Sequence, residues 1–214
     1  LQRAARQMGI RWQSDGEPAA DGFRTGDLLF YSYALFFSPE YRRRYADRLW
    51  SDFPRVLLPR RPDLFHALAG LGEQLASWHL LRKLRSAASR SGVGDTATQG
   101  SGDWRWSVNA APVVVPGFPK YGAGRISVNR DVWLEAVPAE IWDFHAGGHQ
   151  VCRKWLKDRR GRTLTDRDLA VYLGMVSAIG DTLRTMIEID AAVQAAGGWP
   201  AAFGPDAAEA GTSV

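Results

Sequence analysis

Residues 163–190, TLTDRDLAVYLGMVSAIGDTLRTMIEID, carry the clearest helical signal in the chain and decide its architecture. Thr165 is followed three residues later by Asp168, which is the pattern of a capping box at a helix start. Apolar residues then recur at steps of three and four over several turns: Leu169, Tyr172, Val176, Ile179, Leu183 and Met186. This spacing predicts one long helix that packs through its apolar stripe and points its acidic residues outward.

Two further helices are predicted upstream. The first begins with Ser38 as N-cap and Pro39 at the first helical position, and it ends before Pro54. Its apolar stripe at i, i+4 spacing consists of Tyr41, Tyr45, Leu49 and Phe53. The second helix starts near residue 62 and reaches about residue 84. Its stripe has steps of four and three: Leu64, Leu68, Leu71, Leu75 and Trp78.

The segments around these helices are less regular. Residues 11–27 are polar and Gly-rich and are predicted to form a loop, whereas the apolar run 28–37 fits a buried helix or a buried strand. Residues 86–103 are small, polar and Gly-rich, which predicts a flexible loop or linker. Residues 195–214 are rich in Ala, Gly and Pro and are predicted to be a frayed or disordered tail.

A small, largely antiparallel β region is predicted in the middle of the chain, at about 104–130. The segments WRWSVN (104–109), PVVVPGF (112–118) and GRISVN (124–129) combine β-branched residues with bounding Pro and Gly, with turns at 116–117 and 122–124. Two prolines bracket the middle segment, which makes it an edge or irregular strand. Helical signals return at residue 138, break at Gly147-Gly148 and resume through Trp155.

These elements predict an α+β protein, mostly helical, with a small β region and a long C-terminal packing helix. We expect one domain over residues 1–194. The composition is that of an ordinary globular protein, with 45% hydrophobic and 23% charged residues. No apolar stretch reaches the roughly 18 residues of a membrane span, and nothing resembles a signal peptide. The single cysteine cannot form a disulfide framework and fits a reducing, cytoplasmic location.

The charge is distributed unevenly. Residues 1–162 carry 25 Lys and Arg against 16 Asp and Glu, whereas residues 163–214 carry 2 against 7. This asymmetry indicates a polyanionic partner for the first three quarters of the chain, although solvated helix faces would give the same composition.

Motifs for catalysis are missing from the sequence. GxxxxGK[ST], GxGxxG after a strand, GxSxG and HExxH do not occur, and the acidic residues form no obvious acid/base pair. We therefore predict that this chain alone is not an enzyme and holds no cofactor or metal of its own.

Residues 143–162, DFHAGGHQVCRKWLKDRRGR, are chemically the most unusual segment. One interpretation is zinc, because His145, His149 and Cys152 could share a helical face. A structural zinc needs four ligands, however, and the other histidines, His66 and His79, lie far upstream. The Gly-Gly pair also disfavours a continuous helix. A second interpretation, Cys152 as a nucleophile, needs an activating environment, and a lone cysteine is more often a small buried hydrophobic residue.

A third interpretation, a phosphate-binding surface, explains more of this segment. Five cations in residues 154–162 would repel one another unless an anion lies nearby. The predicted phosphate contacts of the chain are Arg42, Arg43, Lys154, Lys157, Arg159, Arg160 and Arg162. The predicted base contacts lie in the β region and at the Gly-Gly junction: Lys120, Tyr121, Arg125, Asn129, His149 and Gln150. Each has a side chain that can bind base edges, and for each a surface polar or capping role is the alternative.

Three separated blocks resemble, in order and spacing, the C-terminal specificity domain of the type ISP restriction-modification enzymes. They begin with YALFFSPEYRRR (33–44), LAGLGEQLASWHLLRK (68–83) and VWLEAVPAEIWDF (132–144), and together they cover most of residues 28–190. The most distinctive parts are Asp52-Phe53-Pro54-Arg55 and the segment from Gly147-Gly148 to Lys157. One departure is His149, because the family usually carries an aromatic residue, commonly tyrosine, after the glycine pair.

The resemblance implies a role in long polypeptides that combine a nuclease, a helicase-like translocase, an adenine-N6 DNA methyltransferase and this domain. The chain would recognise a short sequence in double-stranded DNA and present it to a methyltransferase domain that uses S-adenosylmethionine, in a phage-defence enzyme. Its expected partners are DNA and the methyltransferase and helicase-like domains, with no membrane. The alternative is a protein-interaction module whose helix 165–190 docks on a neighbouring methyltransferase or helicase domain.

Overall fold

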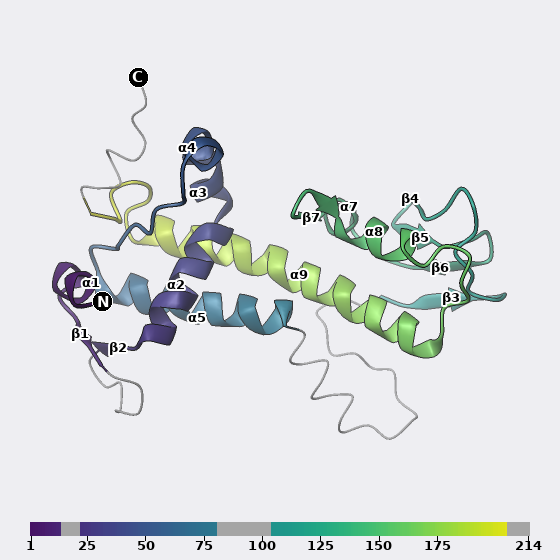
Figure 1. The fold of residues 1–214 in the computed structure, drawn as a ribbon, viewed down its shortest axis with the longest axis horizontal. Coiled ribbons are helices and arrows are strands. Elements are labelled where there is room, and N and C mark those ends of the chain that lie inside the picture. The colour runs from purple at the N-terminus through teal and green to yellow at the C-terminus, as the bar shows by residue number, and fades with distance from the viewer. Residues whose placement is uncertain (14–21, 81–103, 205–214) are drawn as a thin grey trace. The chain divides into compact units, whose positions relative to one another are not determined.

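The computed structural model describes residues 1–13, 22–80 and 104–204, which fall into two compact units. Unit 1 comprises residues 1–77 and 184–214, and unit 2 comprises residues 78–183. The long helix α9, Asp166–Ala195, contributes to both units (Figure 1). Helices predominate and the main sheet is small and antiparallel, which confirms the predicted α+β class. The single domain over residues 1–194 stays a prediction, because two compact units can still act together as one functional domain.

Helices dominate unit 1. They are α1 (Gln2–Met8), α2 (Thr25–Phe37), α3 (Pro39–Arg44), α4 (Ala46–Ser51) and α5 (Pro62–His79), and the strands β1 (Arg11–Trp12) and β2 (Gly22–Phe23) form a parallel pair. Residues 28–37 are therefore helical. The prediction of a loop over 11–27 is wrong for the residues near both of its ends, because these residues form the two strands and the start of α2. The backbone N–H of Arg24 donates to the Asp27 carboxylate over 2.7 Å, which fixes that start.

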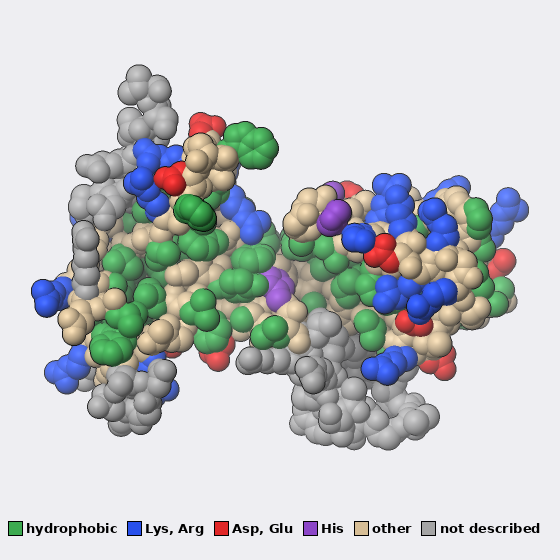
Figure 2. Space-filling model, viewed as in Figure 1, with side chains coloured by type: hydrophobic (Ala, Val, Ile, Leu, Met, Phe, Trp, Pro, Cys, Tyr) green, Lys and Arg blue, Asp and Glu red, His purple; other side chains and the backbone are tan. Residues whose placement is uncertain are grey.

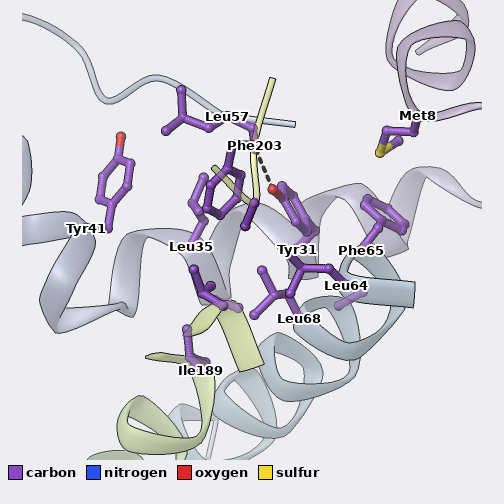
Figure 3. Packing of buried hydrophobic residues seen from close by; sticks show 14 of the residues in the cluster. Met8, Tyr31, Leu35, Tyr41, Leu57, Leu64, Phe65, Leu68, Ile189 and Phe203 are labelled. Atoms are coloured by element: carbon purple, nitrogen blue, oxygen red, sulfur yellow. Dashed lines mark hydrogen bonds between the residues drawn. The ribbon is translucent and has the colours of Figure 1, made fainter. Parts of the chain in front are cut away.

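Helices α2 and α5 cross at very close range (Figure 1). A Cβ atom at Gly72 would lie 1.9 Å from the carbonyl oxygen of Phe30, so only glycine permits this crossing. Beside it, the Tyr31 ring stacks on Phe65 with centroids 5.0 Å apart, and the Tyr31 hydroxyl donates to the carbonyl of Leu57 (Figure 3). The predicted stripe of α5 is confirmed in part, since Leu64, Leu68 and Leu75 are buried here.

The predicted helix after Ser38 is broken into α3 and α4. The Ser38 hydroxyl accepts the N–H of Tyr41 over 3.0 Å, which confirms it as the N-cap. The break falls at Tyr45, and α4 ends before Asp52, whose backbone is extended. Tyr41 and Tyr45 are buried as predicted, but Phe53 lies beyond the last helical turn and is 88% exposed.

The chain after α9 folds back into unit 1. The Trp199 and Phe203 rings stack with centroids 4.3 Å apart, and Phe203 is fully buried. The Arg60 Nε atom donates to the Phe203 carbonyl over 2.6 Å. The predicted disordered tail is therefore wrong for residues 196–204. Residues 205–214 and the predicted loop 86–103 lie outside the described residues.

Helix α9 begins with the predicted capping box. The Thr165 N–H donates to the Asp168 carboxylate over 2.9 Å, and the Asp168 N–H donates to the Thr165 hydroxyl over 3.2 Å. Its apolar stripe packs in the core, but its acidic residues do not all point outward. Asp181 is buried, and the Asp190 carboxylate accepts hydrogen bonds from the Ser38 hydroxyl and from the Glu40 N–H over 3.1 Å.

Unit 2 is built on a four-stranded antiparallel sheet with the order β3-β6-β5-β4. The strands are β3 (Trp106–Val108), β4 (Lys120–Gly122), β5 (Arg125–Ser127) and β6 (Val132–Leu134). The sheet extends past the predicted end at residue 130, because β6 is one of its two inner strands. The segment 112–118 forms only an isolated bridge between Val113 and Thr163, as expected for an irregular strand.

The segment after the sheet has the predicted helices on either side of the glycine pair, but a hairpin separates them. It forms a short helix α7 (Ala139–Trp142), a hairpin of β7 (His145–Ala146) and β8 (His149–Gln150), and helix α8 (Val151–Lys157). The glycine pair forms the hairpin turn, with φ values of 56° and 78°. The histidines and Cys152 therefore share no helical face, as the glycine pair led us to expect. In residues 1–13, 22–80 and 104–204, no helix has the length and hydropathy of a membrane span.

Candidate nucleic-acid interface

The basic segment, residues 153–162, is the most cationic part of unit 2. It holds six cations and one carboxylate, on α8 and the loop that follows. The buried side chains of Cys152 and Leu156 anchor the helix. The loop is fixed by backbone hydrogen bonds from Gly161 to the Val114 carbonyl and from Leu164 to the Pro112 carbonyl, both 2.9 Å long. The fold therefore holds all of these cations except Arg159 at the surface, beside the segment that leads into β4.

Arg159 has a structural role within this segment. Its guanidinium carbon lies 3.5 Å from the ring centroid of Trp155, and its Nη1 atom donates to the Trp155 carbonyl over 3.1 Å. Its Nε atom also lies 3.7 Å from the Asp168 carboxylate, and its side chain is only 27% exposed. Arg159 is one of the predicted phosphate contacts, but its guanidinium group is already bound by the ring and carbonyl of Trp155 and lies near the Asp168 carboxylate.

Three other predicted phosphate contacts have partners at the surface. Lys154 pairs with Asp158 over 2.7 Å, Arg162 lies 3.6 Å from the Asp168 carboxylate, and Arg160 donates to the Phe118 carbonyl over 2.8 Å. Exposed ion pairs are weak, so a polyanion can compete for these side chains at little cost.

Arg153 and Lys157 are the most available cations of the basic segment. Both are exposed, and neither has a carboxylate within 4.0 Å among the described residues. Their i, i+4 spacing places them on one face of α8. Arg153 is missing from the predicted set, although its spacing from Lys157 could have revealed it. Figure 2 shows Lys and Arg side chains gathered over this part of unit 2.

Two predicted base contacts are exposed on the sheet. The Lys120 Nζ atom lies 5.1 Å from the Phe118 ring centroid, and the Phe118 carbonyl binds Arg160, so the fold brings Lys120 close to the basic segment. Arg125 lies at the start of β5, with its guanidinium carbon 5.2 Å from the ring centroid of Trp133.

Three other predicted base contacts are bound within the protein. The Asn129 amide donates to the carbonyls of Ala111 and Val113 over 3.0 and 3.1 Å. The Gln150 amide donates to the Trp142 carbonyl over 2.8 Å. The Tyr121 hydroxyl donates to the Val137 carbonyl over 2.8 Å, and its ring stacks on Trp142 with centroids 5.6 Å apart. Burial raises the pKa of Tyr121. These contacts give the three side chains structural roles.

The histidines and the cysteine form no metal site. His149 is exposed on the β7–β8 hairpin, and the His145 Nδ1 atom lies 2.6 Å from the Asp143 carbonyl. Within the described ranges, no group of three or more His, Cys, Asp or Glu residues is arranged to hold a metal ion. Cys152 is buried, and this burial raises the pKa of its thiol to about 12, which opposes a role as a nucleophile.

The remaining predicted phosphate contacts, Arg42 and Arg43, belong to α3 of unit 1. The Arg42 Nε atom donates to the Phe36 carbonyl over 2.6 Å, and desolvation by burial lowers the pKa of this guanidinium. Arg43 pairs with Glu40 over 2.6 Å. Both side chains therefore have partners within their own helical region.

Comparison with known proteins identifies the class of this fold. Residues 8–187 match the family model described as Type ISP C-terminal specificity domain. This match covers most of the 214 residues, so the chain belongs to that family, as the resemblance predicted. None of the curated proteins compared matches the chain significantly.

Solved structures share the fold. One is a nuclease-deletion mutant of the Type ISP restriction-modification enzyme LlaGI in complex with a DNA substrate mimic. It has a TM-score of 0.53 and 19% identity, over 79% of this chain and 14% of that chain. Another is a DrdV–DNA complex determined by cryo-EM, with a TM-score of 0.55 and 17% identity, over 77% of this chain and 18% of that chain. At these identities the likeness concerns the fold, and the chain spans less than a fifth of either protein.

Proposed function

We propose that this chain is the DNA target-recognition part of a restriction-modification enzyme, and that unit 2 binds duplex DNA through its basic segment. The observation that carries the proposal is the concentration of six cations and one carboxylate in residues 153–162, with Arg153 and Lys157 exposed and unpaired among the described residues. Clusters of this kind bind phosphate through charge, and this binding releases the counterions condensed on the DNA. Membership of a specificity-domain family supports DNA as the polyanion.

The proposal divides the cations by role. Arg153, Lys154, Lys157, Arg160 and Arg162 contact phosphates and set the position of the chain on the duplex. Exposed polar side chains elsewhere in unit 2, among them Lys120, Arg125 and His149, read base edges. The two solved relatives described above are bound to DNA or to a DNA mimic, which supports this assignment.

Catalysis is assigned to other parts of the larger enzyme. In this proposal, the chain directs an adenine-N6 methyltransferase domain, which binds S-adenosylmethionine, and linked nuclease and helicase-like domains to the recognised site. Incubation of the chain alone with target DNA and radiolabelled S-adenosylmethionine should transfer no label to the DNA. Transfer of label by the purified chain would contradict a non-catalytic role.

A protein-interaction role is not supported by α9. The apolar stripe that suggested a docking face is used within the protein, since Tyr172, Val176 and Ile179 are all buried.

The salt dependence of DNA binding tests the proposal. Affinity for a duplex would be measured between 50 and 200 mM salt for the wild type and for Arg153→Gln and Lys157→Gln. Each substitution should weaken binding to all sequences alike and reduce the slope of log affinity against log salt by about 0.9 per lost phosphate contact. Arg61→Gln is the matched control, because this exposed arginine lies in unit 1 beside Asp63. Equal slopes for all four proteins would reduce the basic segment to a solvated surface.

A further inference from the structure

Arg125 occupies a rigid position on the outer face of the sheet. It begins β5 directly after the two-residue turn Ala123-Gly124, whose φ values are 50° and 72°. The next residue, Ile126, is fully buried, so strand alternation directs Arg125 to the opposite face of the sheet. The turn itself is tied to the body of unit 2, because the Val137 N–H donates to the Gly124 carbonyl over 2.8 Å.

Trp133 provides a fixed surface beneath this side chain. Its position within β6 is set by pairing with Ser127 of β5 and Ser107 of β3. Its indole Nε1 atom donates to the Glu135 carboxylate over 2.8 Å, which fixes the orientation of the ring. The Arg125 guanidinium carbon lies 5.2 Å from the ring centroid, within the range of a cation–π contact.

The hydrogen-bond donors of Arg125 are accessible. Its cross-strand partner is Gly122, which has no side chain, and a Cβ atom built there would meet nothing within 4 Å. Among the described residues, no carboxylate lies within 4.0 Å of the guanidinium. Arg125 therefore lies over an aromatic ring and forms no ion pair within 4.0 Å among the described residues.

We propose that Arg125, held by Trp133, reads one guanine of the target through bidentate hydrogen bonds to the N7 and O6 atoms. This inference rests on the proposed function and goes further, because it names the base and the residues that position the reader. Guanine offers two adjacent acceptors in the major groove, and the planar fork of arginine matches them. Because this side chain already lies over the Trp133 ring, it loses less conformational entropy on binding than a mobile arginine would.

This arrangement suits base reading better than phosphate binding. Phosphate contacts tolerate mobile side chains. Among the described residues, no cation of α8 lies over an aromatic ring, and Arg159 of the following loop, which lies over Trp155, is bound internally. Trp133 and Glu135 act here as positioning residues, and neither is required to touch DNA.

The test uses the 214-residue chain and its selected target duplex. A randomised duplex pool first gives the bound motif, and each guanine in it is then replaced in turn by 7-deazaguanine. This base keeps Watson–Crick pairing but lacks the N7 acceptor. The wild type should lose about tenfold in affinity at one position, as expected for one hydrogen bond to a charged donor. Arg125→Gln should lose all sensitivity to the replacement at that position and accept other bases there.

Variants of the ring separate positioning from folding. Trp133→Leu should reduce the sensitivity at the same position, and Trp133→Phe, which keeps an aromatic face, should restore part of it. Arg130→Gln is the matched control, since it removes the same charge from the exposed turn between β5 and β6 and should leave the sensitivity unchanged. Urea unfolding of each variant confirms that the sheet is intact.

Two results would overturn the inference. One is a selected motif in which no guanine is sensitive to loss of N7. The other is a folded Arg125→Gln protein with the same sensitivity as the wild type. In either case selective binding itself would persist, so the proposed function would stand. Failure of the wild type to select any motif would instead refute the proposed function.

Discussion

The guanidinium carbon of Arg159 lies 3.5 Å from the centroid of the Trp155 ring, and both side chains are partly buried in unit 2. The Trp155 ring also packs against the buried Tyr172, with centroids 5.2 Å apart. A cation in the middle of the basic segment thus joins α8 to α9. This relationship separates the cations that hold the fold from those that are free to bind DNA.

Arg159 and Lys157 should therefore respond differently to truncation. Arg159→Ala loses the cation–π contact, the hydrogen bond to the Trp155 carbonyl and packing of the side-chain stem. We expect the free energy of unfolding to fall by about 1–3 kcal/mol. Lys157→Ala removes an exposed side chain and should change it by less than about 0.5 kcal/mol. Urea unfolding followed by tryptophan fluorescence gives both values, and equal values would refute a structural role for Arg159.

Asp168 predicts how stability depends on pH. Hydrogen bonds from the N–H and hydroxyl of Thr165, followed by the charges of Arg162 and Arg159, lower the pKa of this carboxyl group. A pKa that is lower in the folded state contributes stability above the unfolded value of about 3.9, and this contribution is lost as pH falls through the folded value. Asp168→Asn should therefore lower stability at neutral pH and flatten its decline below about pH 4.

The matched control for this experiment is Asp166→Asn. The Asp166 carboxylate is exposed in the first turn of α9 and makes no hydrogen bond among the described residues. Its substitution should leave the acid limb of the stability curve close to that of the wild type. An unchanged acid limb in Asp168→Asn as well would show that the capping contacts contribute little.

The crossing of α2 and α5 makes opposite predictions for two glycines of one helix. Gly72→Ala places a methyl group against the Phe30 carbonyl and should destabilise unit 1 by about 3 kcal/mol or more. Gly70→Ala meets nothing within 4 Å on an exposed helical position, so it should stabilise by about 0.5–1 kcal/mol. Thermal unfolding compares the two variants, and a tolerated Gly72→Ala would contradict the close crossing.

The Cys152 thiol should be unreactive in the folded protein. It is fully buried, its Sγ atom lies 3.6 Å from the Ile141 carbonyl, and burial raises its pKa to about 12. At pH 8, labelling by a thiol reagent should proceed only as fast as the protein opens, and it should become rapid in concentrated urea. Complete labelling within seconds under native conditions would show that the thiol is accessible.

Local signals in the sequence predicted the parts of the fold that depend on neighbouring residues. The capping pair Thr165 and Asp168 marks the start of α9, and Ser38 marks the start of α3, because the contacts span three residues. The sequence does not predict the hairpin at 145–150, since helix-forming segments flank it and a glycine pair in that position indicates only a break within a helix. The return of residues 196–204 was missed because Phe203 is held by Arg60, a partner 143 residues away.

The candidate interface shows the same division. Most of its cations could be named from the sequence, since they cluster between residues 154 and 162. Which of them are free could not, because Arg160 binds the carbonyl of Phe118, 42 residues earlier in the chain. In the same way, the packing of Tyr121 against Trp142 and the binding of Asn129 by two backbone carbonyls depend on tertiary structure.

Selection from a randomised duplex pool measures whether this chain reads a DNA sequence. The 214-residue chain would be used at two salt concentrations. We predict that a short motif is enriched at both, because base contacts add to the phosphate contacts that salt weakens. Binding that enriches no motif and disappears at the higher salt concentration would contradict target recognition and leave only a basic surface.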